Sequence, residues 1–224
     1  MLFRSKYLFM SPSMSPADIR KSYVLDELDE KRVASDPYRQ FSQWWEEVLK
    51  AGIEEPNAMI LATADKQGRP EARTVLLKGF DTAGFVFYTN YESAKAQQLN
   101  DNPFCSLLFF WKELERQVRI IGAVEKVSAI ETAEYFNSRP EGSRIGAWAS
   151  PQSRVVADKQ WLENNYREYE VKFKEGEIPV PYHWGGYRVV AERIEFWQGR
   201  PNRMHDRIQY RKEAGRWIIE RLAP

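Results

Sequence analysis

Short apolar segments separated by glycine-containing turns follow one another along most of this chain. From residue 58 to residue 90 the sequence reads AMILATA, the turn DKQGRP, ARTVLLKGF, the turn DTAG, and FVFYTN. Segments of this length joined by short turns are typical of antiparallel strands that pair in chain order. The pattern therefore predicts a β-meander, which restricts the chain to folds built on an antiparallel sheet.

Helical patterns interrupt the strand segments. Asp36 followed by Pro37 provides an N-cap and a first helical residue, and Gly52 ends the pattern. Ser128 and Glu131 form a capping box that predicts a helix to about Asn137. We expect further helices over residues 93–103 and 158–173, and further strands over residues 105–111, 116–127, 187–198, 205–212 and 216–222. The pattern indicates a mainly β fold with α decoration (α+β), an antiparallel barrel with peripheral helices.

The nearly balanced charge of the chain restricts its partners. Its 33 basic and 32 acidic residues give a formal net charge of +1. Because nucleic-acid binders usually carry a clear basic excess, we expect no nucleic-acid partner, and any anion site must be local. The single cysteine, Cys105, excludes an intrachain disulfide and favours a reducing compartment, so we expect a cytoplasmic protein. No apolar run approaches the roughly 20 residues of a membrane span, so no membrane partner is expected.

The first residues, MLFRSKYLFMSPSMSP, are mildly basic and apolar. Their apolar stretch is too short and too interrupted for a signal peptide. We expect residues 1–19 to be a disordered leader, or translated sequence upstream of a later start, and residues 20–224 to form one domain.

One group of basic residues lies near the C-terminus, in the sequence RMHDR. If this segment is extended, Arg203, His205 and Arg207 share one face of a strand. Such a face is either a solvated edge strand protected by charge or a local anion site, and the residues alone leave both readings open.

A second group lies where the helix after Ser128 ends. Tyr135, Arg139 and Ser143 are spaced four residues apart, and hydroxyls with a guanidinium suit a phosphate group. The alternative is a helix C-terminus with an arginine that compensates the helix dipole. A third candidate is the segment Tyr88, Thr89 and Asn90, before the helix that Ser93 could cap, because free backbone N–H groups there could hold an anion.

Other chemistries lack their motifs. The chain has no GxGxxG, P-loop or HExxH sequence, and two histidines with one cysteine are too few for a convincing zinc site, so no metal is expected. His183, in PYHWGG, is expected to be a loop or packing residue.

Taken together, the motifs RTVLLKGF, FYTN, ERQVRI, YFNSRP, IGAW, WGGYRV, IEFWQG and HDR, with the C-terminal ERLAP, resemble the pyridoxine (pyridoxamine) 5'-phosphate oxidase family. The resemblance runs in order from about Arg20 to Pro224. It implies an FMN-binding split β-barrel and a homodimer with FMN at the subunit interface. The implied reaction oxidises pyridoxine 5'-phosphate or pyridoxamine 5'-phosphate to pyridoxal 5'-phosphate, with O2 as acceptor, and releases hydrogen peroxide, with ammonia from the amine.

The resemblance also implies roles for single residues. The implied catalytic residues are Arg203 and His205. The implied FMN contacts are Arg73, Thr74, Val75, Leu76, Leu77, Lys78, Tyr88, Thr89, Lys95, Gln117, Gln152, Ser153, Trp197 and Arg207. The implied substrate contacts are Lys78, Tyr135, Arg139, Ser143, Arg203 and His205, with Arg20 and Tyr23 in an N-terminal segment that closes over the substrate. The sequence departs from the family pattern at Ala94, where a basic residue is common, so we expect one FMN phosphate contact fewer.

Two other functions fit the same scaffold. One is a flavin- or deazaflavin-dependent reductase with a different substrate, and the other is a non-catalytic carrier of FMN or pyridoxal phosphate. The YFNSRP and HDR segments favour the oxidase, because they supply the implied contacts to the substrate phosphate and the reacting centre.

Overall fold

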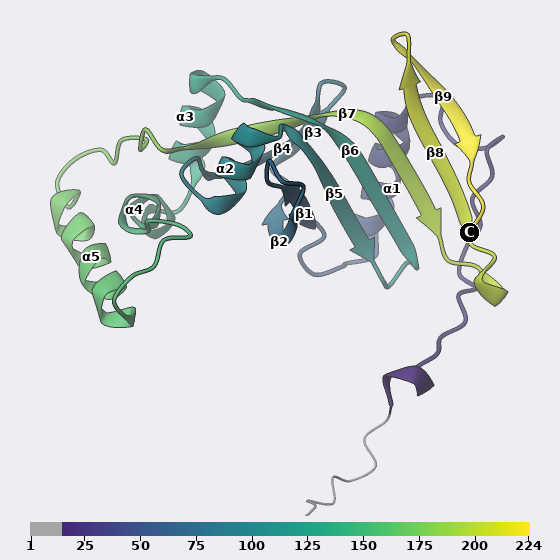
Figure 1. Cartoon of the computed structure of the whole chain (residues 1–224), viewed down its shortest axis with the longest axis horizontal. Helices are drawn as coiled ribbons and strands as arrows, with labels where there is room; N and C mark the ends of the chain where they lie inside the picture. The colour runs from purple at the N-terminus through teal and green to yellow at the C-terminus, as the bar shows by residue number, and fades with distance from the viewer. Residues whose placement is uncertain (1–14) are drawn as a thin grey trace, which may run out of the picture.

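A computed structural model describes residues 15–224, so most of the predicted leader lies outside the described residues (Figure 1). Within these residues, nine strands form one antiparallel sheet. They are β1 (Ala58–Ala64), β2 (Pro70–Leu76), β3 (Gly79–Asp81), β4 (Gly84–Asn90), β5 (Phe104–Trp111), β6 (Arg116–Lys126), β7 (Trp184–Gln198), β8 (Asp206–Glu213) and β9 (Arg216–Arg221). Hairpins connect neighbours in the chain as the turn pattern predicts, but the strand expected over residues 72–80 divides into β2 and β3.

That division changes the predicted meander. β2 pairs with β1, whereas β3 pairs with β4, and the order across the sheet is β2-β1-β5-β6-β7-β4-β3. On one edge of β7, the first part of the strand pairs with β4 and the last part pairs with β8. On the other edge, β6 pairs with β7 along nearly the whole length of β7. The sheet therefore splits at the edge of β7 that carries β4 and β8, which gives the split barrel that the resemblance implies.

A bulge between Ile121 and Gly122 bends the long pair of β6 and β7. A Cβ on Gly122 would lie 2.0 Å from the carbonyl oxygen of Val190. Only glycine allows the two backbones to approach this closely, so this residue permits the curvature.

The α-helices are α1 (Pro37–Lys50), α2 (Ala94–Asp101), α3 (Ala129–Ser138), α4 (Glu141–Ala149) and α5 (Lys159–Lys172), and the 3-10 helices are η1 (Pro16–Asp18) and η2 (Pro201–Arg203). The predicted Asp36 cap is confirmed, since its carboxylate accepts hydrogen bonds from the N–H groups of Tyr38 and Arg39. Ser128 likewise caps α3. Ser93 lies before α2, but its side chain makes no capping hydrogen bond. None of the helices in residues 15–224 is long and apolar enough to cross a membrane.

The main core lies between α1 and the curled sheet. Phe41 of α1 is fully buried, and its ring centroid lies 5.0 Å from that of Phe85 and 5.4 Å from that of Phe109. Trp44, one helical turn on, packs edge-on against Phe196 at 5.1 Å. These aromatic side chains fix α1 to the strands and stabilise the curvature of the sheet.

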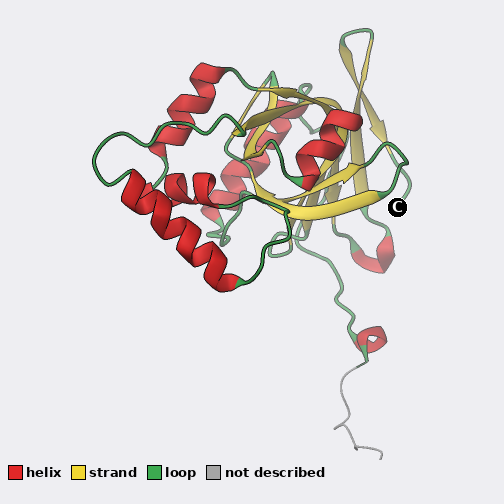
Figure 2. Cartoon of the chain, turned by 60° about the vertical axis from the view of Figure 1, so that its left-hand side comes forward, coloured by secondary structure: helices red, strands yellow, loops and turns green. Residues whose placement is uncertain are grey.

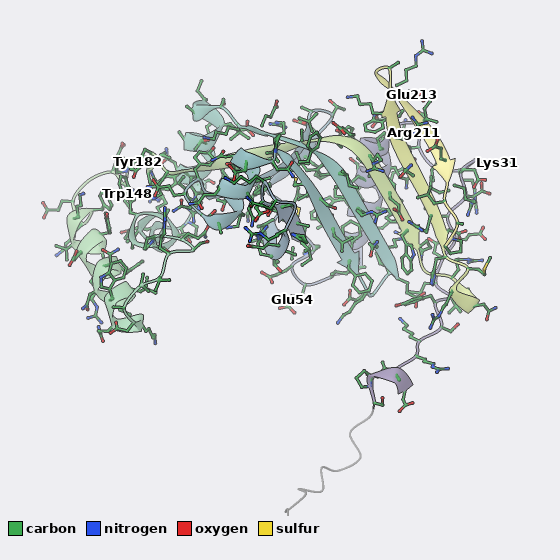
Figure 3. All side chains as sticks on the ribbon, viewed as in Figure 1. Lys31, Glu54, Trp148, Tyr182, Arg211 and Glu213 are labelled. Carbon is green, nitrogen blue, oxygen red and sulfur yellow. The ribbon has the colours of Figure 1, made fainter. Side chains whose placement is uncertain are left out.

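Two different structures occupy the ends of the molecule. A second apolar cluster joins Phe136, Ile145 and Trp184 where α3, α4 and α5 gather, and the hairpin of β8 and β9 lies at the other end (Figures 1 and 2). Figure 3 shows Trp148 and Tyr182 at the helical end and Arg211 and Glu213 on the hairpin. The long strand β7 runs from one end to the other.

Candidate functional site

A cavity of about 680 Å³ lies at the helical end of the sheet. Strands β2 and β4, helices α2, α3 and α4, and the loop after α4 all contribute to its walls. The lining residues are Arg73, Thr74, Val75, Leu76, Lys78, Tyr88, Thr89, Asn90, Lys95, Tyr135, Arg139, Pro140, Ser143, Gly146, Ala147, Ser150, Gln152 and Trp184. The cavity thus collects most of the residues implied for the cofactor and for the substrate phosphate.

One cationic group of this cavity is Arg73 with Lys95. The Arg73 guanidinium donates to the Thr63 hydroxyl at 2.5 Å and to the Gln98 side-chain oxygen at 3.3 Å. Lys95 Nζ donates to Gln152 Oε1 at 2.9 Å. Burial, and secondarily the charge of Arg73, lowers the pKa of Lys95 below its ordinary value. A bound anion would stabilise both cations, so this part of the cavity suits a phosphate.

A second cationic group is Arg139, at the end of α3. Its guanidinium lies 4.7 Å from the ring centroid of Trp184, and its buried Nη1 has no hydrogen-bond partner among the described residues. Burial lowers its pKa. A buried guanidinium nitrogen without a partner is costly, and an anionic ligand in the cavity would satisfy it.

Aromatic rings and a helix complete this side of the cavity. Tyr135 stacks on Tyr88 with ring centroids 4.0 Å apart, and Lys78 Nζ lies 5.9 Å from the Tyr135 ring. Ser143 lies in the first turn of α4 and lines the same cavity as Arg139. The spacing of four residues predicted from the sequence therefore places Tyr135, Arg139 and Ser143 around one space, although α4 itself was not predicted.

The helix α4 was missed because Pro140 follows Arg139, and proline ordinarily ends a helix. Here Pro140 is the N-cap of a new helix, and the helix brings Ser143, Gly146 and Ala147 to the cavity. Trp184 was also missed as a lining residue, whereas Asn90 belongs to the third predicted group, with Tyr88 and Thr89. The only signal for Trp184 was its position in WGGYRV, a motif already quoted for the resemblance.

The predicted residues near the C-terminus lie elsewhere, beyond the far end of β7. The prediction of an extended segment from Arg203 is wrong, since Asn202 and Arg203 have left-handed backbone angles in η2 and β8 begins only at Asp206. Arg203 and His205 are therefore neighbours in a turn, while Arg207 is in the strand.

The side chains of His205 and Arg207 make different contacts. His205 Nδ1 accepts the backbone N–H of Arg200 at 3.1 Å, and its ring centroid lies 4.6 Å from that of Trp197. Burial, followed by the charge of Arg203, lowers the pKa of His205, and Asp206 opposes this effect. Arg207 donates to the Glu195 carboxylate at 2.7 Å. An uncharged His205 ring with Nδ1 as acceptor carries its proton on Nε2, a donor that has no partner in the described part of the chain and could bind a ligand.

Asp206 has a structural role in this turn. One carboxylate oxygen accepts from the Leu28 N–H and the other from Arg221.

Other predicted residues also lie outside the cavity. Leu77 is buried in the main core, Ser153 follows the lining residue Gln152, and Gln117 is on β6 opposite Trp197. Tyr23 packs against Trp197 and His205, and Arg20 is exposed near it in sequence.

The predicted site has two parts, the cavity and the turn with Arg203 and His205, and one chain does not bring them together. Trp184, at the start of β7, lines the cavity, whereas Gln198, at its end, adjoins the turn that carries Arg203. The strand has 15 residues, which corresponds to a length on the order of 45 Å before its curvature is considered. A substrate-sized molecule cannot span that distance, so a site that uses both halves needs a second chain.

The sequence matches known protein families and relatives along most of its length. The family described as pyridoxamine 5'-phosphate oxidase matches residues 45–173, and the pyridoxine 5'-phosphate oxidase C-terminal dimerisation region matches residues 184–224. A pyridoxine/pyridoxamine 5'-phosphate oxidase from Synechocystis sp. is 53% identical over 94% of this chain and 99% of its own length. The enzyme of the same name from Pseudomonas savastanoi pv. phaseolicola is 55% identical over 93% and 98%.

Solved structures show the same fold. PhzG from Burkholderia lata, in complex with tetrahydrophenazine-1-carboxylic acid, has a TM-score of 0.84 at 27% identity and covers 89% of this chain and 99% of its own. An FMN-binding protein from Nostoc punctiforme has a TM-score of 0.67 at 18% identity, over 86% and 100%, which supports the split-barrel fold alone. On the extent of its match to the two family regions and to the full-length relatives, the chain belongs to the pyridoxamine 5'-phosphate oxidase family.

Proposed function

We propose that this protein oxidises pyridoxine 5'-phosphate or pyridoxamine 5'-phosphate to pyridoxal 5'-phosphate, with FMN as cofactor. The observation that carries the proposal is a single cavity with two cationic groups, Arg73 with Lys95 and Arg139, whose buried Nη1 has no hydrogen-bond partner among the described residues. Cofactor and substrate each bring a phosphate, so two anion-binding groups in one cavity are what this reaction requires. The names of the relatives supply the identity of the substrates.

The cofactor half of the proposal assigns the FMN phosphate to Arg73 and Lys95. Thr89 and Gln152 lie beside Lys95, and the Thr89 hydroxyl donates to the Gln152 side-chain oxygen at 3.2 Å. The chemistry that FMN supplies when bound is acceptance of a hydride from the substrate and transfer of the electrons to O2, which forms hydrogen peroxide. The protein's own contribution is to hold the phosphate end and to orient the ring.

The substrate half assigns the substrate phosphate to Tyr135, Arg139 and Ser143. These groups lie far from the reacting carbon, so their binding energy is available to orient the substrate ring. Lys78 faces the same cavity and is shared between the two ligands. Arg139 Nη1, which has no partner within residues 15–224, favours a phosphorylated substrate over the other substrates that a reductase on this scaffold would use. A non-catalytic carrier would not need Arg203 and His205.

Arg203 and His205 are proposed to reach the cavity from a partner subunit. Arg203 would hold the reacting oxygen or nitrogen, and the Nε2 proton of His205 would bind a polar group of the substrate ring. The support is the length of β7, together with the match of residues 184–224 to a dimerisation region. The FMN would then lie at the subunit interface, where Gln117, Trp197 and Arg207 of the partner complete its site.

An exposed apolar surface is available for such an interface. Phe104 and Phe110 of β5 are 48% and 54% exposed, and Ile60 of the neighbouring β1 is 38% exposed. Apolar side chains in a row on a sheet face are typical of surfaces covered by another subunit.

The test is to purify the protein, measure flavin absorbance, and add pyridoxamine 5'-phosphate in air. We expect pyridoxal 5'-phosphate and hydrogen peroxide to form in equal amounts. A protein that stays inactive after FMN has been supplied contradicts the oxidase assignment, and substrate binding without turnover favours the carrier. The cytoplasmic location and the single domain over residues 20–224 stay predictions.

A further inference from the structure

A buried carboxylate outside the cavity holds part of the N-terminal segment. Glu115, in the turn between β5 and β6, has a side chain that is only 1% exposed. Its Oε2 accepts the backbone N–H groups of Val24 at 2.8 Å and Leu25 at 3.1 Å, and its Oε1 lies 2.9 Å from Lys21 Nζ. Three of its contacts therefore go to one short segment, residues 21–25, which we name the strap.

The strap has little else to hold it in place. Val24 and Leu25 are 64% and 57% exposed, so their side chains contribute little burial. Tyr23 is the one half-buried side chain of the strap, and it packs on Trp197 and His205 with ring centroids 5.7 and 5.9 Å away. The next polar anchor along the chain is Asp26, whose carboxylate pairs with Arg116. The polar contacts to Glu115 are thus the main attachment of the strap before Asp26.

The backbone around Glu115 is shaped for this contact. Glu115 has a φ of 55°, and its carbonyl oxygen accepts the N–H of Gly199 at 2.8 Å. A Cβ on Gly199 would lie 2.7 Å from Tyr23 Cβ and 3.1 Å from Glu115 Cβ. Glycine at this position lets the strap, the turn and the end of β7 approach one another closely.

The carboxylate remains charged in this place. Burial opposes ionisation of Glu115, but the ion pair with Lys21 and the two backbone donors outweigh it and lower the pKa of the carboxyl. A charged acceptor makes stronger hydrogen bonds than a neutral one, roughly 1.5–3 kcal/mol against about 1 kcal/mol.

We propose that Glu115 is a positioning residue of the oxidase reaction, whose carboxylate fixes the strap so that Tyr23 lies against His205 and Trp197. The proposal rests on the proposed function, because His205 acts there on the substrate. Glu115 touches neither ligand, and its effect reaches the site only through Tyr23.

The first test needs no substrate. In Glu115→Gln the charge is lost while the shape is kept. The matched control is Glu113→Gln, since Glu113 lies on the same turn, is half exposed and, among the described residues, pairs only with Lys112. We expect chymotrypsin to cleave after Tyr23 about tenfold faster in Glu115→Gln than in the control, because the strap opens more often. Equal cleavage rates would overturn the proposal, even if the protein proved to have no oxidase activity.

A second variant guards against a folding defect. Lys21→Gln removes the exposed partner of the carboxylate and leaves the buried side untouched. It should speed the same cleavage by a smaller factor, with an unchanged thermal midpoint. No change in cleavage would contradict the ion pair as part of the anchor.

The third test asks whether Glu115 acts through Tyr23. We expect Glu115→Gln to raise KM for pyridoxamine 5'-phosphate about fivefold to tenfold with a smaller change in kcat, and to add nothing in a Tyr23→Ala background. A merely structural role predicts additive losses in the double variant, and that result would overturn the proposal. Full rates in Glu115→Gln with an active wild-type enzyme would overturn it as well.

Discussion

The arginines of this structure differ in whether the protein itself supplies a partner for their charge. Arg116 and Arg221 are satisfied by protein carboxylates, whereas Arg139 leaves a buried nitrogen without a partner among the described residues. The first two therefore stabilise the folded protein, and Arg139 keeps its binding capacity for a ligand. A cation of this kind is the mark of a binding site rather than of a stabilising pair.

Replacement of Arg139 should separate phosphorylated from unphosphorylated substrates. We expect Arg139→Ala to raise KM for pyridoxamine 5'-phosphate by roughly 10- to 100-fold, the loss of a charged hydrogen-bonded contact of about 1.5–3 kcal/mol. Steady-state kinetics with pyridoxamine, which lacks the phosphate, should show little further loss. The control is Arg167→Ala, an exposed arginine of α5. Equal losses with both substrates would contradict the phosphate contact.

The titration of His205 should respond to its charged neighbour. Burial and Arg203 both disfavour the charged ring, so the folded protein binds this proton at lower pH than the unfolded chain does. The free energy of unfolding is therefore higher above the ordinary pKa of histidine, where the ring is neutral in both states. This stability is lost as the pH falls from that value toward the lower pKa of His205 in the folded protein.

In Arg203→Ala, the pKa of His205 should rise toward its ordinary value, as followed by NMR of the ring protons. Only His183 gives a second histidine signal, and His183→Gln assigns it. A fall in the His205 pKa in Arg203→Ala would show that the arginine does not act through its charge.

At the scale of elements, the strands and helices follow local signals, with a few instructive exceptions. The strand over residues 58–64 and the caps Asp36 and Ser128 are local features, and they appear as predicted. The division of residues 72–80 was not visible, because it depends on β2 and β3 pairing with different partners. The turn at Arg203 was not visible either, since Asn202 and Arg203 have left-handed backbone angles that residues other than glycine seldom adopt.

The Asp36 cap should make a measurable contribution to α1. Asp36→Ala removes the acceptor for two backbone N–H groups and should lower the free energy of unfolding by about 1 kcal/mol. Asp36→Asn keeps a capping oxygen and should lose much less. Urea denaturation of both variants is the measurement, and equal losses would assign the effect to charge instead of capping.

At the scale of the whole molecule, the curled sheet and its long strand β7 decide how the site can be assembled. The cavity with Arg139 belongs to one end, and the turn with Arg203 belongs to the other. A two-fold dimer can place the turn of one subunit at the cavity of its partner, and it does so twice.

Mixed dimers test this arrangement. Arg139→Ala and Arg203→Ala should each be nearly inactive alone at substrate concentrations below KM. When the two chains are co-expressed, half of the dimers are mixed and each mixed dimer has one site without a substitution, so activity should recover to about a quarter of wild type.

The matched control co-expresses Arg203→Ala with His205→Ala, which leaves one substitution in every site of a mixed dimer. No recovery is expected there. An absence of recovery in the first pair as well would show that both residues serve the same subunit's site.

The sequence by itself determined the elements that local rules govern, and it supplied the predicted residues of the site. Turn residues and caps set most strand and helix positions, the balanced charge confined anion binding to local sites, and the motif order identified the family. The tertiary structure decided the spatial arrangement of these parts. It split the sheet at β7, began the helix α4 at Pro140, buried Glu115 and separated Arg139 from Arg203. These depend on pairings between residues distant in the chain, and their free energies come from packing and register that no local pattern encodes.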